Sequence, residues 1–181
     1  RFAEPFLRLL GAADDIASFD ASDYESATCL HDMNEPIPDC YKGRYSVVID
    51  GGTLEHVFNF PVALKNCMEM IEVGGYYLAM TPANNFMGHG FYQFSPELYF
   101  RIFSAQNGFA TEQIILFEDD RDAQWFQVSD PEDVGKRVEM VNSKPAYLLV
   151  QARKISEVDI FETAPQQSDY SATWKKEKPD L

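Results

Sequence analysis

The fold is best inferred from the stretch Tyr45–Pro61, "YSVVIDGGTLEHVFNFP". A continuous apolar run ends there in Asp50, and two glycines follow directly. Such a run is expected of a strand covered on both faces, as in a parallel sheet between two layers of helices. Gly51 and Gly52 permit positive φ and let the backbone approach a ligand without a Cβ in between. We therefore interpret the segment as a buried strand with a ligand-binding joint at its exit.

The composition fits one globular domain that binds neither nucleic acid nor an anionic membrane. The chain has 181 residues, 45% hydrophobic and 14% aromatic, which is enough to bury a core. Its net charge is −14 and its 15 basic residues are scattered, so no phosphate-binding surface is indicated. No apolar run reaches the ~20 residues of a membrane span, and no signal peptide is recognised. Three cysteines without a CxxC spacing are typical of reduced thiols in a cytoplasmic protein.

The hydrophobic pattern along the chain predicts helices that alternate with strands. Helices are expected at 2–10, 60–71 and 96–106, and strands at 15–20, 27–32, 45–50, 76–82, 111–119 and 146–154. Alternation implies right-handed crossovers and a mostly parallel sheet with helices on both faces. The last two strands have no helical pattern between them, so they are expected to form an antiparallel pair at one edge. The predicted fold class is an α/β three-layer sandwich over residues 1–160, followed by a polar tail over 161–181.

Three of the early strands end in carboxylates, at Asp20, Asp32 and Asp50. In open parallel sheets, ligands bind beyond the carboxyl ends of the strands. Each aspartate taken singly is as readily a turn or N-cap residue, but three in succession favour a ligand site on a shared rim. The alternative is that the two glycines only turn the chain, and that Glu55 and His56 are solvated loop residues.

The segments that carry a family resemblance are "FDASDYE", "HDMNEPIP", "YSVVIDGGTLEHVFNFPVALKNCMEMIEVGGYYLAMTP" and "NGF". Together they resemble a class I S-adenosylmethionine-dependent methyltransferase over about residues 1 to 155. The segment "GHGFYQFSPELYF" resembles a subgroup associated with glycan or small-metabolite modification. The resemblance implies a Rossmann-like fold, S-adenosylmethionine as cofactor, and methyl transfer to a small-molecule or glycan-type acceptor.

The resemblance also implies cofactor contacts at the ends of three strands. In that fold the second strand ends in an acidic residue that holds the ribose hydroxyls. The third ends in a pair that flanks the adenine, and the fourth ends beside the methionine part. In chain order, the matching residues are Asp20 with Ala21, Asp32 with Met33, and Asp50 with Gly51 and Gly52.

The chain departs from the family pattern at its beginning. The family's first strand and its glycine-rich turn have no counterpart, and residues 2–10 match the helix that follows that turn. Because the missing strand is central in the family's sheet, we expect a gap in the sheet here. The chain is then an N-terminally truncated piece, or another segment fills the gap, or cofactor binding has been lost. The first residue is Arg1 rather than Met, which favours the first explanation.

Methyl transfer to a hydroxyl or a protonated amine needs a base, and histidine with its unperturbed pKa of ~6.5 is suited to this task. His89, in a glycine-flanked loop after the fifth strand of the family pattern, is the first candidate. His56 is the second, with a bracing contact to Glu55 as its structural alternative. No metal is required, and no convincing ligand cluster is found in the sequence. The candidate substrate-binding residues near His89 are Tyr92, Gln93 and Asn85.

Two other classes of function stay open. A non-catalytic methyltransferase-like module for binding or assembly is favoured by the missing glycine-rich turn. A nicotinamide-dependent oxidoreductase is disfavoured, because neither a G-x-G-x-x-G nor a Tyr-x-x-x-Lys pattern occurs. The expected partner is a small-molecule or glycan substrate, without nucleic acid or membrane, and a homo-oligomer is left open.

Overall fold

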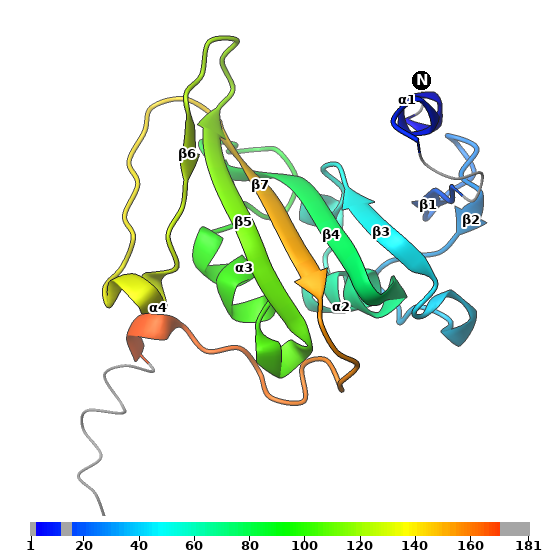
Figure 1. The fold of residues 1–181 in the computed structure, drawn as a ribbon. Helices are drawn as coiled ribbons and strands as arrows, with labels where there is room; N and C mark the ends of the chain where they lie inside the picture. Colours follow the sequence, from blue (N-terminus) through cyan, green and yellow to red (C-terminus); the bar gives the residue numbers. More distant parts are fainter. Residues whose placement is uncertain (1–2, 12–15, 171–181) are drawn as a thin grey trace, which may run out of the picture.

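The computed structural model describes residues 3–11 and 16–170 and has a mixed α/β fold (Figure 1). Its central sheet has five strands in the order β3-β4-β7-β5-β6. These are β3 (Tyr45–Asp50), β4 (Ile71–Asn84), β5 (Phe109–Glu118), β6 (Trp125–Gln127) and β7 (Ala146–Lys154). A separate two-stranded sheet pairs β1 (Phe19–Asp20) with β2 (Cys29–Leu30) in parallel.

The strand directions follow from the pairings. β3 and β4 pair in parallel, whereas β7 is antiparallel to both β4 and β5. Consequently β3, β4 and β5 all run the same way, and the α/β class with a mostly parallel sheet is confirmed. The predicted antiparallel pair is formed by β5 and β7, but β7 lies inside the sheet. The edge belongs to the short β6, which pairs antiparallel with β5.

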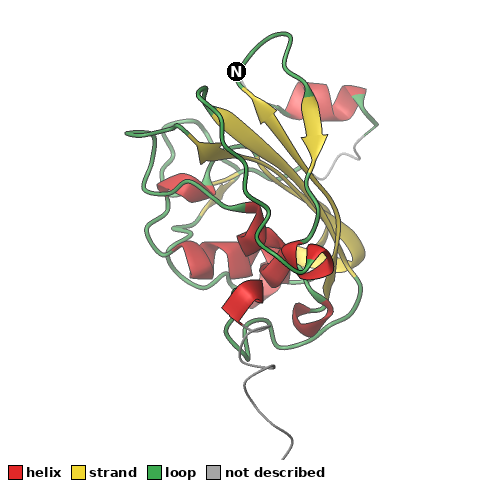
Figure 2. Ribbon diagram, turned by 90° about the vertical axis from the view of Figure 1, so that its left-hand side faces the viewer, coloured by secondary structure: helices red, strands yellow, loops and turns green. Residues whose placement is uncertain are grey.

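Helices α2 (Phe60–Met70) and α3 (Pro96–Ile102) lie on one face of the central sheet, as the two views in Figures 1 and 2 agree. The remaining helices are α1 (Glu4–Leu9) and α4 (Pro131–Val134), with 3₁₀ turns at Asp39–Tyr41, Leu54–His56 and Ala105–Asn107. Among the described residues, no helix covers the other face of the five-stranded sheet, so the second helical layer of the sandwich is not seen. Within residues 3–11 and 16–170, no helix is both long and apolar enough to cross a membrane.

β3 lacks the burial expected of a strand covered on both faces. Val47 is 43% exposed and Ile49 is 53% exposed. Among the described strands, β3 is hydrogen-bonded to β4 only, so it is an edge strand of the larger sheet. β1 and β2 lie beyond this edge without joining it (Figure 1), and the ring of Phe19 contacts that of Tyr45 at 6.1 Å between centroids. No described strand joins β1 to β3, so the gap expected in the sheet is present in the part of the chain that the structure describes.

A buried asparagine on α2 holds the segment that follows β2. Asn66 is 1% exposed, and its Oδ1 accepts a 2.8 Å hydrogen bond from the backbone N–H of Ile37. Its Nδ2 donates to the carbonyl of Glu35 at 2.7 Å and to that of Met33 at 3.3 Å. Because one side chain satisfies three backbone groups, this loop has a defined position against α2.

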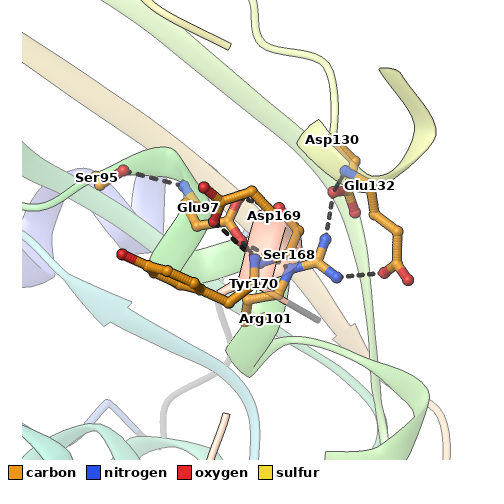
Figure 3. Close-up of polar contacts among 8 residues, drawn as sticks. All are labelled: Ser95, Glu97, Arg101, Asp130, Glu132, Ser168, Asp169 and Tyr170. Atoms are coloured by element: carbon orange, nitrogen blue, oxygen red, sulfur yellow. Dashed lines mark hydrogen bonds and ion pairs between the residues drawn. The ribbon is translucent and has the colours of Figure 1, made fainter. Parts of the chain in front are cut away.

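Arg101 on α3 connects this helix to the start of α4, and Glu97 connects it to the C-terminal segment (Figure 3). Its guanidinium forms ion pairs with Asp130 and Glu132, and its Nε lies 3.5 Å from Oε1 of Glu97. Glu97 in turn accepts hydrogen bonds from the backbone N–H of Ser168 at 2.7 Å and from its hydroxyl at 3.1 Å. The predicted polar tail is thus attached to α3 up to Ser168, and residues 171–181 lie outside the described part.

Candidate functional site

Asp50 at the end of β3 braces the turn that follows it. The residue is 3% exposed. Its Oδ1 accepts a 2.8 Å hydrogen bond from the backbone N–H of Thr53, and its Oδ2 accepts a 3.3 Å bond from the hydroxyl of Tyr77. Burial raises the pKa of Asp50 and the hydrogen bond from Thr53 partly offsets that rise. Its carboxylate therefore lies beneath the protein surface.

The two glycines after Asp50 differ in what they accommodate. Gly52 has a φ of +97°, and a Cβ there would lie 3.2 Å from Oε1 of Glu55. Gly51 is exposed, and a Cβ there would meet no described atom within 4 Å. The turn and the close carboxylate thus require glycine at position 52, whereas the backbone at Gly51 is open to a ligand.

Glu55 is the centre of a cluster with two histidines. It lies in the 3₁₀ turn Leu54–His56, and its side chain is 2% exposed. Its Oε1 is 3.5 Å from Nε2 of His89 and 3.9 Å from Nε2 of His56. The two imidazole rings are 5.0 Å apart between centroids, and each histidine side chain is half exposed. A buried carboxylate therefore lies beside two imidazoles that solvent can reach.

The loop after β4 carries His89 to this cluster. The neighbours Gly88 and Gly90 have φ values of +91° and +69°. The backbone N–H of Phe91 donates a 2.7 Å hydrogen bond to the carbonyl of Glu55. A Cβ at Gly90 would lie 2.7 Å from that same carbonyl oxygen. The loop backbone is thus packed directly against the backbone of Glu55.

The structure brings together the two histidines that sequence analysis names as candidate bases. Glu55, which lies between them, was expected only as a brace or a solvated loop residue. Its burial and its contact with His89 were missed, because they depend on a loop that is distant in the chain. The adjacency of Glu55 and His56 is the one signal the sequence offers.

The three predicted substrate-binding side chains all bond to the protein itself. They therefore shape the loop around His89 in this structure. The hydroxyl of Tyr92 donates to the Phe58 carbonyl at 2.7 Å. The side-chain oxygen of Gln93 accepts from the Phe86 N–H at 2.7 Å. The side-chain amide of Asn85 donates to the Lys144 carbonyl at 2.8 Å.

Asp20 is the last residue of β1 and Asp32 comes two residues after β2. Because the two strands are parallel, both aspartates lie at the same rim of that small sheet. Oδ1 of Asp20 accepts from the backbone N–H of Ser22 at 2.8 Å and from its hydroxyl at 3.1 Å. Oδ1 of Asp32 accepts from the backbone N–H of Asn34 at 2.9 Å and from its side chain at 2.7 Å, which lowers the pKa of Asp32. No hydrogen bond or ion pair in residues 3–11 and 16–170 links these carboxylates to Asp50, His56 or His89.

The residues predicted to bind the cofactor beside these aspartates differ in burial. Ala21 is exposed, and Met33 is partly buried and packs against the core.

A pair of asparagines connects the loop after β2 with the segment after His56. Oδ1 of Asn34 accepts a 2.8 Å hydrogen bond from the backbone N–H of Asn59. Its carbonyl accepts a 3.1 Å bond from the side chain of Asn59. The loop that holds Asp32 is thereby joined to the end of the loop that holds the Glu55 cluster.

Two surface hollows lie away from this cluster. The first, near the β5–β6 turn, is lined by residues that include Asp120, Phe126 and Lys144. The second is lined by residues that include Pro96 and Arg137. Neither contains a histidine or a predicted site residue, so we assign no function to them.

No protein-family model and no curated protein matches the sequence. Among solved structures, the chain is similar to a proposed methyltransferase from Bacillus halodurans C-125, with 14% identity and a TM-score of 0.53. That match covers 85% of this chain and 86% of the other. A second structure, concerned with conversion of a disulfide bond into a thioacetal group during echinomycin biosynthesis, matches with 10% identity and a TM-score of 0.46. It covers 98% of this chain and 79% of the other, but so low a score carries no argument. The first likeness shows the fold alone, a Rossmann-like α/β fold.

Proposed function

We propose that this chain is an S-adenosylmethionine-dependent methyltransferase that acts on a small-molecule or glycan-type acceptor. The fold likeness supports the class of protein, although a fold alone does not fix chemistry. The observation that carries the proposal is the buried Glu55 carboxylate beside His56 and His89 at the exit of β3. A buried carboxylate that contacts solvent-accessible imidazoles is a common arrangement for proton transfer.

The residues at the strand ends fit a bound nucleoside donor. Both hydrogen bonds that the side chain of Asp20 accepts in the described structure use Oδ1, so Oδ2 keeps its capacity for ribose hydroxyls. A Cβ at the exposed Gly51 would meet no described atom within 4 Å beyond its chain neighbours, which leaves room beside the end of β3. When bound, S-adenosylmethionine supplies an electrophilic methyl group, and the protein supplies alignment and proton transfer.

We assign His89 as the proton acceptor. Its Nε2 lies beside Glu55, so the carboxylate favours the tautomer with the proton on Nε2 and leaves Nδ1 as the base. The acceptor's hydroxyl or ammonium proton passes to Nδ1, and the negative charge of Glu55 stabilises the resulting imidazolium. His56, 3.9 Å from the same oxygen, is the second candidate for this role.

Calorimetric titration of the protein with S-adenosylhomocysteine tests the cofactor part of the proposal. We expect saturable binding with a stoichiometry of one ligand per chain. If no binding is detected at millimolar ligand, the enzyme proposal is wrong.

A non-catalytic methyltransferase-like module for binding or assembly is the second candidate. It is favoured by the position of β3 at the end of the larger sheet, where β4 is its one neighbour among the described strands. For either candidate we propose a cytoplasmic location, since Cys29, Cys40 and Cys67 are all free thiols in the structure.

A further inference from the structure

We propose that Glu55, His56 and His89 bind a divalent transition-metal ion such as Zn²⁺. The three side chains come from two loops, and the ligand atoms of the set all lie within 4.8 Å of one another. The inference goes beyond methyl transfer and does not depend on it, because the chain's own side chains supply the whole ligand set.

The spacing of the ligand atoms fits an ion placed between them. In a tetrahedral zinc site with bonds near 2.0–2.1 Å, neighbouring ligand atoms lie about 3.3 Å apart. Oε1 of Glu55 is 3.5 Å from Nε2 of His89 and 3.9 Å from Nε2 of His56. Both distances exceed those of ordinary N–H···O hydrogen bonds, which end near ~3.2 Å. A small contraction of the cluster around an ion would bring all three groups to ligand distance.

The second oxygen of Glu55 provides an independent observation. Oε2 is buried and has no hydrogen-bond partner in the described structure. An ionised carboxylate that is buried without partners is costly, because it has lost its hydration without compensation. A cation held by this carboxylate would neutralise the buried charge. The half-exposed imidazoles leave solvent a route by which an ion can reach the carboxylate.

The donor set selects the class of metal. Two imidazole nitrogens with one carboxylate suit Zn²⁺, Co²⁺ or Ni²⁺, whereas Mg²⁺ and Ca²⁺ prefer sets made of oxygen. Three protein ligands also leave at least one coordination position for water or another molecule. An ion at Nε2 of His89 requires the proton on Nδ1, so the metal-bound form and the base assigned above are alternative states of one site.

The test is calorimetric titration of the metal-free protein with Zn²⁺, together with the shift of its thermal unfolding midpoint. We expect one Zn²⁺ per chain and a raised midpoint, since a ligand that binds the folded state stabilises it. Mg²⁺ should produce neither effect. Loss of an outer-shell partner commonly weakens metal binding 10–100-fold, so loss of a ligand in His89→Ala or Glu55→Gln should weaken it by about 100-fold or more.

His31→Ala is the matched control, because this third histidine lies outside the cluster and contacts the Glu35 carbonyl at 3.0 Å through Nε2. Cys40→Ser is the control for binding by an exposed thiol. Both control variants should bind Zn²⁺ with the affinity of the parent.

His56→Ala and His89→Ala alter half-exposed side chains, so their unfolding midpoints without metal should stay close to that of the parent. Unchanged Zn²⁺ affinity in the Glu55 and His89 variants, loss of binding in Cys40→Ser, or no binding by the parent would each overturn the proposal.

Discussion

The backbone N–H of Phe91 donates a 2.7 Å hydrogen bond to the backbone carbonyl of Glu55. This bond joins the loop after β4 to the turn after β3, and it holds the two loops at the point where Nε2 of His89 comes within 3.5 Å of the Glu55 carboxylate. The site therefore rests on a close approach of two backbones, and glycine makes that approach feasible.

Gly90→Ala should disrupt this approach. The φ of Gly90 is +69°, and a Cβ would lie 2.7 Å from the carbonyl oxygen of Glu55. The strained φ costs about 1 kcal/mol, and relief of the clash adds about 1–3 kcal/mol. Gly88→Ala is the control, because φ is +91° there but no described atom lies within 4 Å of the new Cβ. Urea unfolding should show a larger decrease in the free energy of unfolding for Gly90→Ala than for Gly88→Ala. Equal decreases would show that the loop backbone does not pack closely against Glu55.

The segment from β3 to β4 shows how far the sequence predicts this fold. The strand at 45–50 was predicted with its observed bounds, but its burial was not. An apolar run indicates a strand without revealing whether a neighbour covers it, and Val47 and Ile49 are exposed at an edge. The helix expected to 71 ends at Met70, and Ile71 already pairs with Tyr45 of β3. Strand pairing here overrides the local helical pattern.

The candidate site was predicted in part for a similar reason. The two histidines were identified from residue type and loop context, which are local features. The contact between Glu55 and His89 is not local, and neither is the pairing of Asn85 with the Lys144 carbonyl. Such contacts appear only once the sheet has set the distance between the loops.

Asp50→Asn should alter the pH dependence of stability. Burial raises the pKa of Asp50 above its value in the unfolded chain, so the folded state binds the proton more tightly. The stabilising contribution of this protonation is present below the unfolded pKa of ~3.9 and is lost as pH rises through the higher folded pKa. The variant should therefore gain stability relative to the parent as pH rises above about 4.

Asp120→Asn is the control for this measurement, because the pKa of Asp120 is shifted in the opposite direction. The hydrogen bond from Lys144 lowers the pKa of Asp120, so its contribution is present above the unfolded pKa and is lost as pH falls through the folded pKa. Urea unfolding at a series of pH values should thus show the two parent–variant differences changing in opposite directions. A pH-independent difference for Asp50→Asn would contradict the role of burial.

Asn66→Leu should be strongly destabilising. The substitution leaves the backbone N–H of Ile37 and the carbonyl of Glu35 without their buried partner, and each such group costs about 1–3 kcal/mol. Asn59→Ala is the comparison, because it removes an exposed 3.1 Å bond to the Asn34 carbonyl. The free energy of unfolding should fall by about 2–6 kcal/mol for the first variant and by less than about 1.5 kcal/mol for the second. Similar losses would mean that Asn66 does not fix the loop after β2.

Asp20→Ala tests the ribose contact. If Asp20 holds the ribose hydroxyls, its loss removes charge-assisted hydrogen bonds worth about 1.5–3 kcal/mol, or roughly 10–150-fold in affinity for S-adenosylhomocysteine. Ser22→Ala is the control, because it removes one donor to Asp20 and keeps the carboxylate. Calorimetric titration should show weaker binding for the first variant only. The same affinity in Asp20→Ala and the parent would remove Asp20 from the cofactor site.

His89→Ala should slow methyl transfer much more than it weakens cofactor binding. A positioned general base commonly contributes 10²–10⁴-fold, and His89, whose Nε2 lies 3.5 Å from Oε1 of Glu55, is the base that we propose. Single-turnover rates with a hydroxyl-bearing acceptor should fall by about this factor, while the affinity for S-adenosylhomocysteine stays within about twofold. The assay is run with a metal chelator, so that loss of a metal ligand cannot account for the change. His31→Ala is the control, since its ring lies outside the cluster. A rate equal to that of the parent would exclude His89 as the base and leave His56 to be tested in the same way.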